Sequence, residues 1–161
     1  MAFEEIIKNA TEESINGTRT GDTIREVQAI QRYIKNAKKI VIPNKNGIKV
    51  KVINKVLNEY NLPKAEYLKI NTNFADSDRY PAIAKGLLAV DQSDADLIIA
   101  RGRLGLPGSG SLLIFMDNKG RILTSGSSPS HAISKINIED AVYNETVEAL
   151  EKIGFSKSQK Q

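Results

Sequence analysis

Hydrophobic positions along the chain follow two different spacings, which together predict alternating helices and strands. Apolar residues recur every three or four positions, as on one face of a helix, in the ranges 2–15, 23–34, 81–88 and 138–153. Strands are predicted at 38–43, 66–70 and 95–100, of which 95–100 is a continuous apolar run, and an antiparallel pair is predicted at 111–116 and 121–123. This order predicts an α/β fold with a mixed, partly parallel sheet flanked by helices, and the apolar run 95–100 as its central strand.

Several helix ends carry recognisable signals. Thr23 and Glu26 have the spacing of a capping box, in which each side chain satisfies a backbone N–H of the other residue. Asn137 suits the cap of the last helix, and Asn16-Gly17 and Gly154 are typical helix stops. Pro81 suits a first helical position, and residues 117–120 (Asp-Asn-Lys-Gly) suit a hairpin turn.

The segment after Pro43 fits two structures. Asn46-Gly47 between apolar runs is a hairpin signal, and Ile48 begins an alternation typical of a strand. The later apolar positions up to Tyr60 instead have helical spacing. We expect a helix over residues 48–60.

The amino-acid composition limits the number of domains and the kinds of catalytic chemistry that the protein can have. The 161 residues suit a single domain over 1–155, followed by a disordered tail at 156–161. The absence of cysteine excludes disulfides and thiolate chemistry, and His131 is the only histidine. The acidic start does not resemble a signal peptide, and apolar runs of about five residues are too short to cross a membrane, so a cytoplasmic protein is expected.

The net charge of +4 favours anionic partners without choosing among them. A nucleotide, a nucleic acid and a merely solvated basic surface all remain compatible with it. Aromatic residues are few and do not alternate with basic residues, so no stacking platform for nucleic acid is expected.

The segment from Arg101 to Ser111, RGRLGLPGSGS, is the most unusual in the chain and directly follows the predicted central strand. Glycine lets a backbone approach a ligand, and consecutive N–H groups can hold an anion. Arg101 and Arg103 have the planar donors that match phosphate. The segment matches neither a Walker A loop nor a GxGxxG fingerprint. It could also be a flexible connection whose arginines face water.

Three further polar loops could contact a ligand or serve only as connections. The loop 43–47 would place Lys45 at a helix N-terminus if a helix follows. The loop 17–22 precedes a helix, and 127–131 combines hydroxyls with His131, a side chain that titrates near neutral pH. Nucleotidyl transfer normally uses Mg²⁺, which needs one or two carboxylates. The candidate carboxylates are Asp76, Asp78, Asp94, Asp96 and Asp117, and the sequence does not select among them.

The stretch RGRLGLPGSGSLLIFMDNKGRIL, followed by SSPSHAI, resembles the HcgB family of guanylyltransferases, which act in iron-guanylylpyridinol cofactor biosynthesis in methanogenic archaea. The resemblance implies a fold similar to inosine triphosphate pyrophosphatases, a homodimer, and transfer of GMP from GTP to a pyridinol hydroxyl with release of pyrophosphate. The cofactor made in this way serves the iron-only hydrogenase. The related fold places an Asn/Lys loop near the nucleotide phosphates, and Asn44, Lys45 and Asn46 look like that loop.

These implications give a set of expected site residues. Arg101, Arg103 and Lys45 are expected to neutralise phosphate charge, with Mg²⁺ as the expected cofactor. The residues expected to contact GTP or the pyridinol are Asn44, Asn46, Thr18, Thr20, Gly105, Pro107, Gly108, Ser109, Gly110, Ser111, Ser128 and His131. A nucleoside triphosphate pyrophosphatase, a non-catalytic nucleotide- or nucleic-acid-binding module and a structural dimer module remain alternatives.

Overall fold

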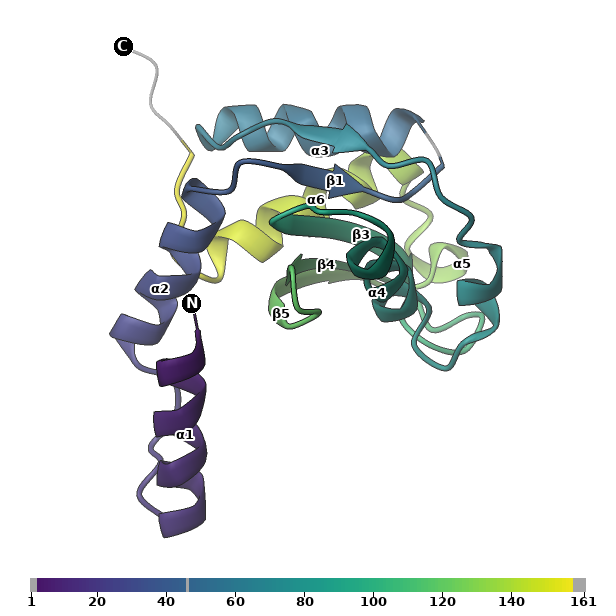
Figure 1. The fold of residues 1–161 in the computed structure, drawn as a ribbon. Helices are drawn as coiled ribbons and strands as arrows, with labels where there is room; N and C mark the ends of the chain where they lie inside the picture. The colour runs from purple at the N-terminus through teal and green to yellow at the C-terminus, as the bar shows by residue number, and fades with distance from the viewer. Residues whose placement is uncertain (1–2, 46, 158–161) are drawn as a thin grey trace.

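A single five-stranded sheet organises the protein, and our computed structural model describes it over residues 3–45 and 47–157 (Figure 1). The strand order is β2-β1-β3-β4-β5, so β3 is central, as predicted. The strands are β1 Ile40–Ile42, β2 Ala65–Tyr67, β3 Leu97–Arg103, β4 Ser111–Asp117 and β5 Ile122–Ser128. Strand β1 pairs in parallel with β2 and β3, whereas β3, β4 and β5 form an antiparallel meander. The prediction of a mixed, partly parallel sheet is confirmed.

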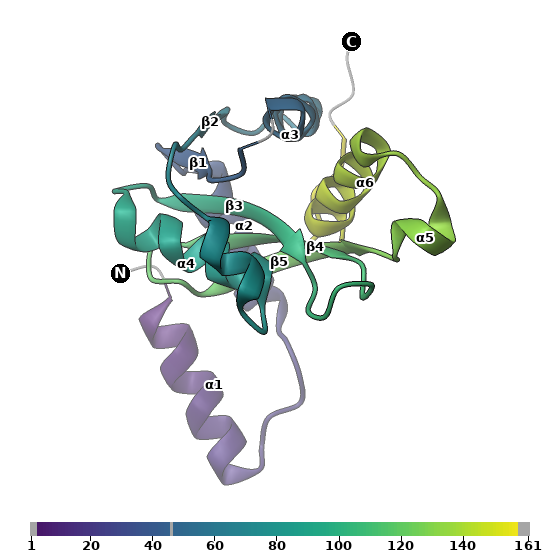
Figure 2. The same ribbon diagram turned by 90° about the vertical axis from the view of Figure 1, so that its right-hand side faces the viewer.

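Helices cover both faces of this sheet (Figures 1 and 2). The helices are α1 Glu4–Asn16, α2 Ile24–Lys35, α3 Gly47–Glu59, α4 Pro81–Gln92, α5 His131–Ser134 and α6 Ile138–Glu151, with a 3₁₀ helix, η1, at Asn73–Ser77. Helices α3 and α6 lie on one face and α4 lies on the other. Helix α1 instead extends away from the sheet and, with residues 17–23, forms a projecting arm (Figure 1).

Side-chain alternation along β3 divides the core into two layers. Leu97 and Ile99 join the cluster under α3 and α6, whereas Ile98 and Ala100 join the cluster under α4. Complete burial of a large aliphatic side chain contributes about 1.5–3 kcal/mol. The same alternation places Arg101 on the α3 and α6 face of the sheet.

Most of the predicted helix ends are confirmed, but α6 ends at Glu151 with Lys152 as its cap, before the predicted stop at Gly154. The Thr23 hydroxyl accepts the Glu26 N–H at 3.2 Å, and the Glu26 carboxylate accepts the Thr23 N–H at 2.8 Å, which completes the capping box. Gly17 ends α1 with φ +74°, a left-handed conformation that favours glycine. The Asn137 side chain accepts the Asp140 N–H at 2.8 Å and so caps α6.

The ambiguous segment after Pro43 forms helix α3, so the helical prediction is confirmed and the hairpin alternative is wrong. Helix α3 buries Ile53, Val56 and Leu57 completely. This buried stripe outweighs the local turn preference of the preceding dipeptide. Asn46 lies outside the described residues.

Other boundaries differ from the sequence pattern. Strand β3 continues to Arg103 because its backbone pairs with β4 up to Ser111, so Arg101 belongs to the strand. Helices η1 and α5 form in segments that hydrophobic spacing left without an element. The predicted tail is described only at residues 156–157, and the remainder lies outside the described residues. Within the described part of the chain, no helix is long and apolar enough to cross a membrane.

Candidate functional site

Basic side chains gather where the parallel strands β1 and β3 end and where α3 and α4 begin. We define the cation cluster as Lys45, Lys49, Lys85, Arg101 and Arg103. Helix η1 joins its members: the Lys45 ammonium donates to the side-chain amide oxygen of Asn73 at 2.9 Å, and Lys85 forms an ion pair with Asp76 at 3.3 Å. Ligands of open α/β sheets bind at this edge, beyond the carboxyl ends of the strands.

Asn44 connects the two parallel strands at this edge. Its amide nitrogen donates to the Arg101 carbonyl oxygen at 2.6 Å, and its amide oxygen accepts the Arg101 N–H at 3.0 Å. The side chain is buried, and these bonds continue the contact between β1 and β3 beyond their last paired residues. In this structure Asn44 therefore fixes the position of Arg101, and a substrate contact for Asn44 stays a prediction.

Arg101 lies in a buried network centred on Glu145 of α6. The Arg101 Nε donates to Glu145 Oε1 at 2.7 Å, and Nη2 donates to Glu145 Oε2 at 3.1 Å and to the Ser111 hydroxyl at 3.0 Å. The hydroxyls of Ser111 and Ser128 both donate to Glu145 Oε2 at 2.6 Å. Glu145 has no exposed surface and Arg101 is 6% exposed. The network ties β3, β4, β5 and α6 together beneath the cation cluster.

Most of the charge on Arg101 is thus compensated inside the protein. Its second amino nitrogen, Nη1, makes no hydrogen bond to any residue that the structure describes. That nitrogen is the part of the guanidinium left for a ligand. The predicted phosphate contact of Arg101, which no observation tests, would have to use it.

The glycine-rich segment forms the hairpin connection between β3 and β4. Leu104 N–H donates to the Gly110 carbonyl oxygen at 3.0 Å, which closes the loop, and the Ser109 hydroxyl accepts the Gly105 N–H at 3.0 Å. Gly108 and Gly110 have φ values of +100° and +93°. A Cβ on Gly110 would also overlap the Ser128 carbonyl oxygen, so only glycine fits there. Pro107, Gly108 and Ser109 at the tip are exposed, whereas Ser111 is buried in the Glu145 network.

Lys49 was missed by the sequence reasoning and is the most informative member of the cluster. It lies in the first turn of α3, is half-buried, and makes no hydrogen bond or ion pair to the described residues. Burial lowers the pKa of Lys49, repulsion from Arg101 and Lys85 lowers it further, and attraction by Asp76 and Glu145 offsets only part of this shift. The sequence feature that could have identified Lys49 is its position in the first helical turn after the strand-to-helix loop 43–47. Lys85, in α4, was also missed.

Arg103 also has an unmet donor. Its Nη2 donates to the backbone carbonyl oxygen of Asp76, but its Nε is buried without a hydrogen-bond partner in the part of the chain that the structure describes. A buried N–H without an acceptor costs about 1–3 kcal/mol. Among residues 3–45 and 47–157, the acidic side chains that form ion pairs with the five cations are only Asp76 and Glu145. The arrangement therefore has an excess of positive charge and suits an anionic ligand.

The five carboxylates considered for Mg²⁺ fall at opposite ends of the sheet. Asp96 precedes β3 and Asp117 pairs with Leu97 at its start, and Asp94 lies beside them in an ion pair with Lys39. Asp76 and Asp78 lie at the cluster end. No group of three metal-ligating side chains occurs among residues 3–45 and 47–157. Asp76 lies among the cations, where it pairs with Lys85, and a Mg²⁺ site there stays a prediction.

The remaining expected residues lie in two places. Thr18 and Thr20 are exposed on the projecting arm, away from the cluster (Figures 1 and 2). A contact from them to a ligand in the cluster would have to come from a second copy of the chain. His131 begins α5, is exposed, and its Nδ1 lies 2.8 Å from the Ile136 carbonyl oxygen. Its place near Ser128 leaves it on the rim of the candidate site.

Comparison with known protein families identifies the chain. The model of the family described as "FeGP cofactor biosynthesis protein HcgB, guanylyltransferase" matches residues 3–155. Because this match covers nearly all of the 161 residues, the chain belongs to the HcgB family.

Proposed function

We propose, on the premise that this chain belongs to the HcgB family, that it transfers GMP from GTP to the hydroxyl of a pyridinol and releases pyrophosphate. The family description supports guanylyl transfer in FeGP cofactor biosynthesis. The structural observation that carries the proposal is the half-buried Lys49, which forms no ion pair with the described residues and is repelled by Arg101 and Lys85 more strongly than Asp76 and Glu145 attract it. A nucleoside triphosphate supplies the missing negative charge.

The proposed reaction is an in-line displacement at the α-phosphorus. The pyridinol oxygen forms the new O–P bond and its proton leaves to solvent. The bond from the α-phosphorus to the bridging oxygen breaks, and pyrophosphate takes the electron pair. A pyridinol hydroxyl is more acidic than an alcohol, so the enzyme needs mainly alignment and charge stabilisation.

The cation cluster divides this work by position. Lys49 and Arg103, with their unmet donors, bind the β- and γ-phosphates and stabilise the charge that develops on pyrophosphate. Lys45 and Lys85, each attached to η1, complete the phosphate pocket. Arg101 offers its Nη1 to the nucleotide from the buried network, and Glu145 fixes the orientation of the Arg101 guanidinium.

The loop 104–110 and the residues after β5 form the other wall of the proposed site. Gly105, Pro107, Gly108 and Ser109 supply a largely exposed surface for the acceptor, and Ser128 and His131 approach it from the end of β5 and the start of α5. Asp76 would hold Mg²⁺, which would neutralise phosphate charge in the bound nucleotide. A homodimer in the cytoplasm completes the proposal.

Mass spectrometry of the products tests this function. The purified protein is incubated with GTP, Mg²⁺ and a carboxymethyl-methyl-pyridinol, with Lys49→Met as the matched inactive variant. The proposal predicts a pyridinol–GMP adduct and pyrophosphate from the wild type only. Free GMP and pyrophosphate without an adduct would identify a nucleoside triphosphate pyrophosphatase instead, and no turnover would leave a binding module.

A further inference from the structure

The exposed aromatic side chains are confined to one short part of the chain. Phe74 is 85% exposed, Tyr80 is 56% exposed and Tyr67 is 43% exposed. Every other aromatic residue is buried or half-buried, and these are Phe3, Tyr33, Tyr60, Phe115, Tyr143 and Phe155. The three exposed rings all occur between the end of β2 and the start of α4, which is the segment that carries η1.

The geometry of η1 relates Phe74 to the cation cluster. A 3₁₀ helix has three residues per turn, so residues three apart share a face. Asn73 and Asp76 therefore share the face that contacts Lys45 and Lys85. Ala75 lies on a second face and is buried, whereas Phe74 lies on the third face and is exposed, next to Asn73 in the chain.

We propose that Phe74 is a specificity-determining residue that stacks on the base of the nucleotide whose phosphates bind the cation cluster. The inference rests on the proposed function and adds the part of the protein that contacts the base. The Phe74 ring is 85% exposed, so nearly all of its apolar surface is in contact with water in the free protein. Stacking against a planar heteroaromatic ring would remove apolar surface from water without requiring a preformed pocket.

The covalent link between base and phosphates favours the nucleotide over the acceptor as the stacking partner. Once the triphosphate is held by side chains that contact Asn73 and Asp76, its base can lie no further from the cluster than the α-phosphate and one sugar allow. Phe74 lies between these two residues in the chain. The glycine-rich loop on the opposite wall remains for the pyridinol.

The chain contains no tryptophan, which allows a direct optical test. Phe74→Trp introduces a single indole at the proposed stacking position, and Ile15→Trp introduces one at a similarly exposed position on α1, away from the cluster. The expected result is saturable quenching of the Phe74→Trp fluorescence by GTP, no quenching by inorganic tripolyphosphate, and only linear quenching by GTP in Ile15→Trp. Equal quenching in the two variants, or quenching of the Phe74→Trp fluorescence by the pyridinol alone, would overturn the proposal.

A functional readout separates stacking from a structural role. In Phe74→Ala the KM for GTP should rise roughly tenfold, with the affinity for tripolyphosphate unchanged, and Phe74→Tyr should restore the KM. An unchanged KM in Phe74→Ala would contradict the inference while leaving the proposed function intact. Loss of tripolyphosphate binding in Lys49→Met is independent of Phe74, so failure of the phosphate site and failure of the base contact give different results.

Discussion

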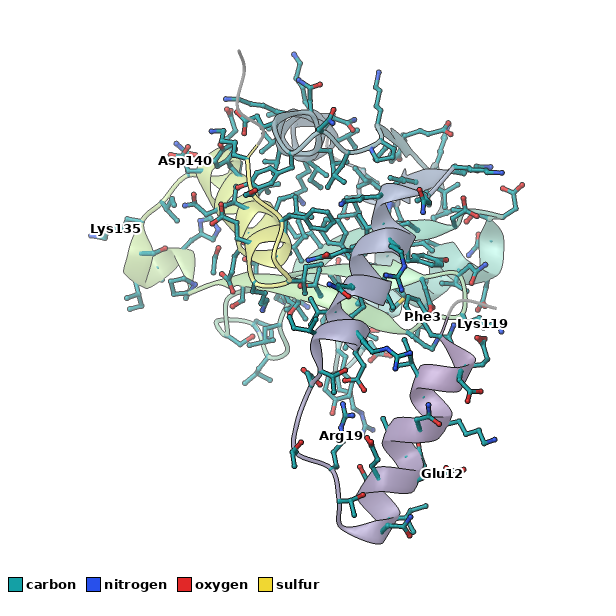
Figure 3. The ribbon with its side chains drawn as sticks, turned by 90° about the vertical axis from the view of Figure 1, so that its left-hand side faces the viewer. Phe3, Glu12, Arg19, Lys119, Lys135 and Asp140 are labelled. Atoms are coloured by element: carbon teal, nitrogen blue, oxygen red, sulfur yellow. The ribbon has the colours of Figure 1, made fainter. Side chains whose placement is uncertain are left out.

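Cationic side chains have opposite surroundings on the projecting arm and at the carboxyl edge of the sheet. On the arm, Arg19 pairs with Glu26 at 2.7 Å, Glu13 at 3.0 Å and Asp22 at 3.4 Å (Figure 3). At the edge, Lys49 has no carboxylate partner among the described residues and lies beside other cations. Three acids surround one cation in the first region, whereas cations exceed acids in the second.

This difference shows how a structural charge can be told from a functional one. The Arg19 guanidinium lowers the pKa of Glu26 to about 2, so the pair contributes stability above the ordinary carboxylate range and loses it as the pH falls towards 2. Lys49 has the reverse property, because burial and repulsion make its charged form unfavourable in the folded protein. A group that costs stability in this way is a candidate for binding a ligand of opposite charge.

The largest expected effect concerns the buried network beneath the cluster. Glu145→Ala leaves the Arg101 charge buried without compensation, so the free energy of unfolding should fall by about 3–5 kcal/mol in denaturant titrations. The double variant Arg101→Met/Glu145→Met removes both charges and should recover most of that loss. A double variant as unstable as Glu145→Ala would show that the ion pair does not explain the stability of this region.

The next largest effect is expected on the transfer activity when Lys49 is replaced. Lys49→Met should reduce guanylyl transfer roughly 100-fold or more, as expected for losing one stabilising charge in the transition state. Its melting temperature should be unchanged or higher, because a buried and repelled charge is removed. Lys51→Met, at an exposed position on the same helix, is the matched control and should keep full turnover. Equal activity in both variants would place the phosphates elsewhere.

The pH dependence of GTP affinity tests whether the charge on Lys49 binds the nucleotide. The pKa of Lys49 lies below that of an ordinary lysine in the free protein, and a bound anion should raise it. GTP affinity should therefore fall as the pH rises through the lowered pKa of free Lys49, and the protein should take up protons on binding there. Lys49→Arg, whose guanidinium stays charged, should remove this alkaline loss. An identical alkaline profile in Lys49→Arg would assign the titration to another group.

The smallest effect on transfer activity is expected from substitutions on the projecting arm. The double variant Thr18→Val/Thr20→Val alters exposed hydroxyls away from the cluster, so transfer activity should stay within about twofold of the wild type. Steady-state kinetics with the pyridinol acceptor provide the measurement. A large loss of turnover in a folded variant would break the comparison, because it would mean that the arm enters the active site of a second copy.

The sequence predicted the elements more fully than the site. Hydrophobic spacing identified most helices and the central strand, because β3 buries a continuous apolar run that includes Leu97 and Ile99. Strand β2 buries only Ala65 and β5 is largely polar, so the predicted ranges 66–70 and 121–123 match Ala65–Tyr67 and Ile122–Ser128 only in part. The short helices η1 and α5 were not predicted, because they bury few side chains and leave no hydrophobic pattern in the sequence.

The site was harder to predict because residue type does not reveal which charges are already compensated. Arg101 and Lys49 are both basic residues near strand ends, yet only Arg101 meets a buried carboxylate, and Glu145 lies 44 positions further along the chain. Such a distant pairing leaves no local pattern. The family resemblance, by contrast, rests on contiguous residues and is confirmed by the match over residues 3–155.

Calorimetric titration with inorganic tripolyphosphate tests the central claim most directly, because this probe has neither base nor acceptor. The account predicts saturable binding to the wild type and to Lys51→Met, and binding at least roughly tenfold weaker in Lys49→Met. Equal affinity in all three proteins would contradict the assignment of the cation cluster as the phosphate site.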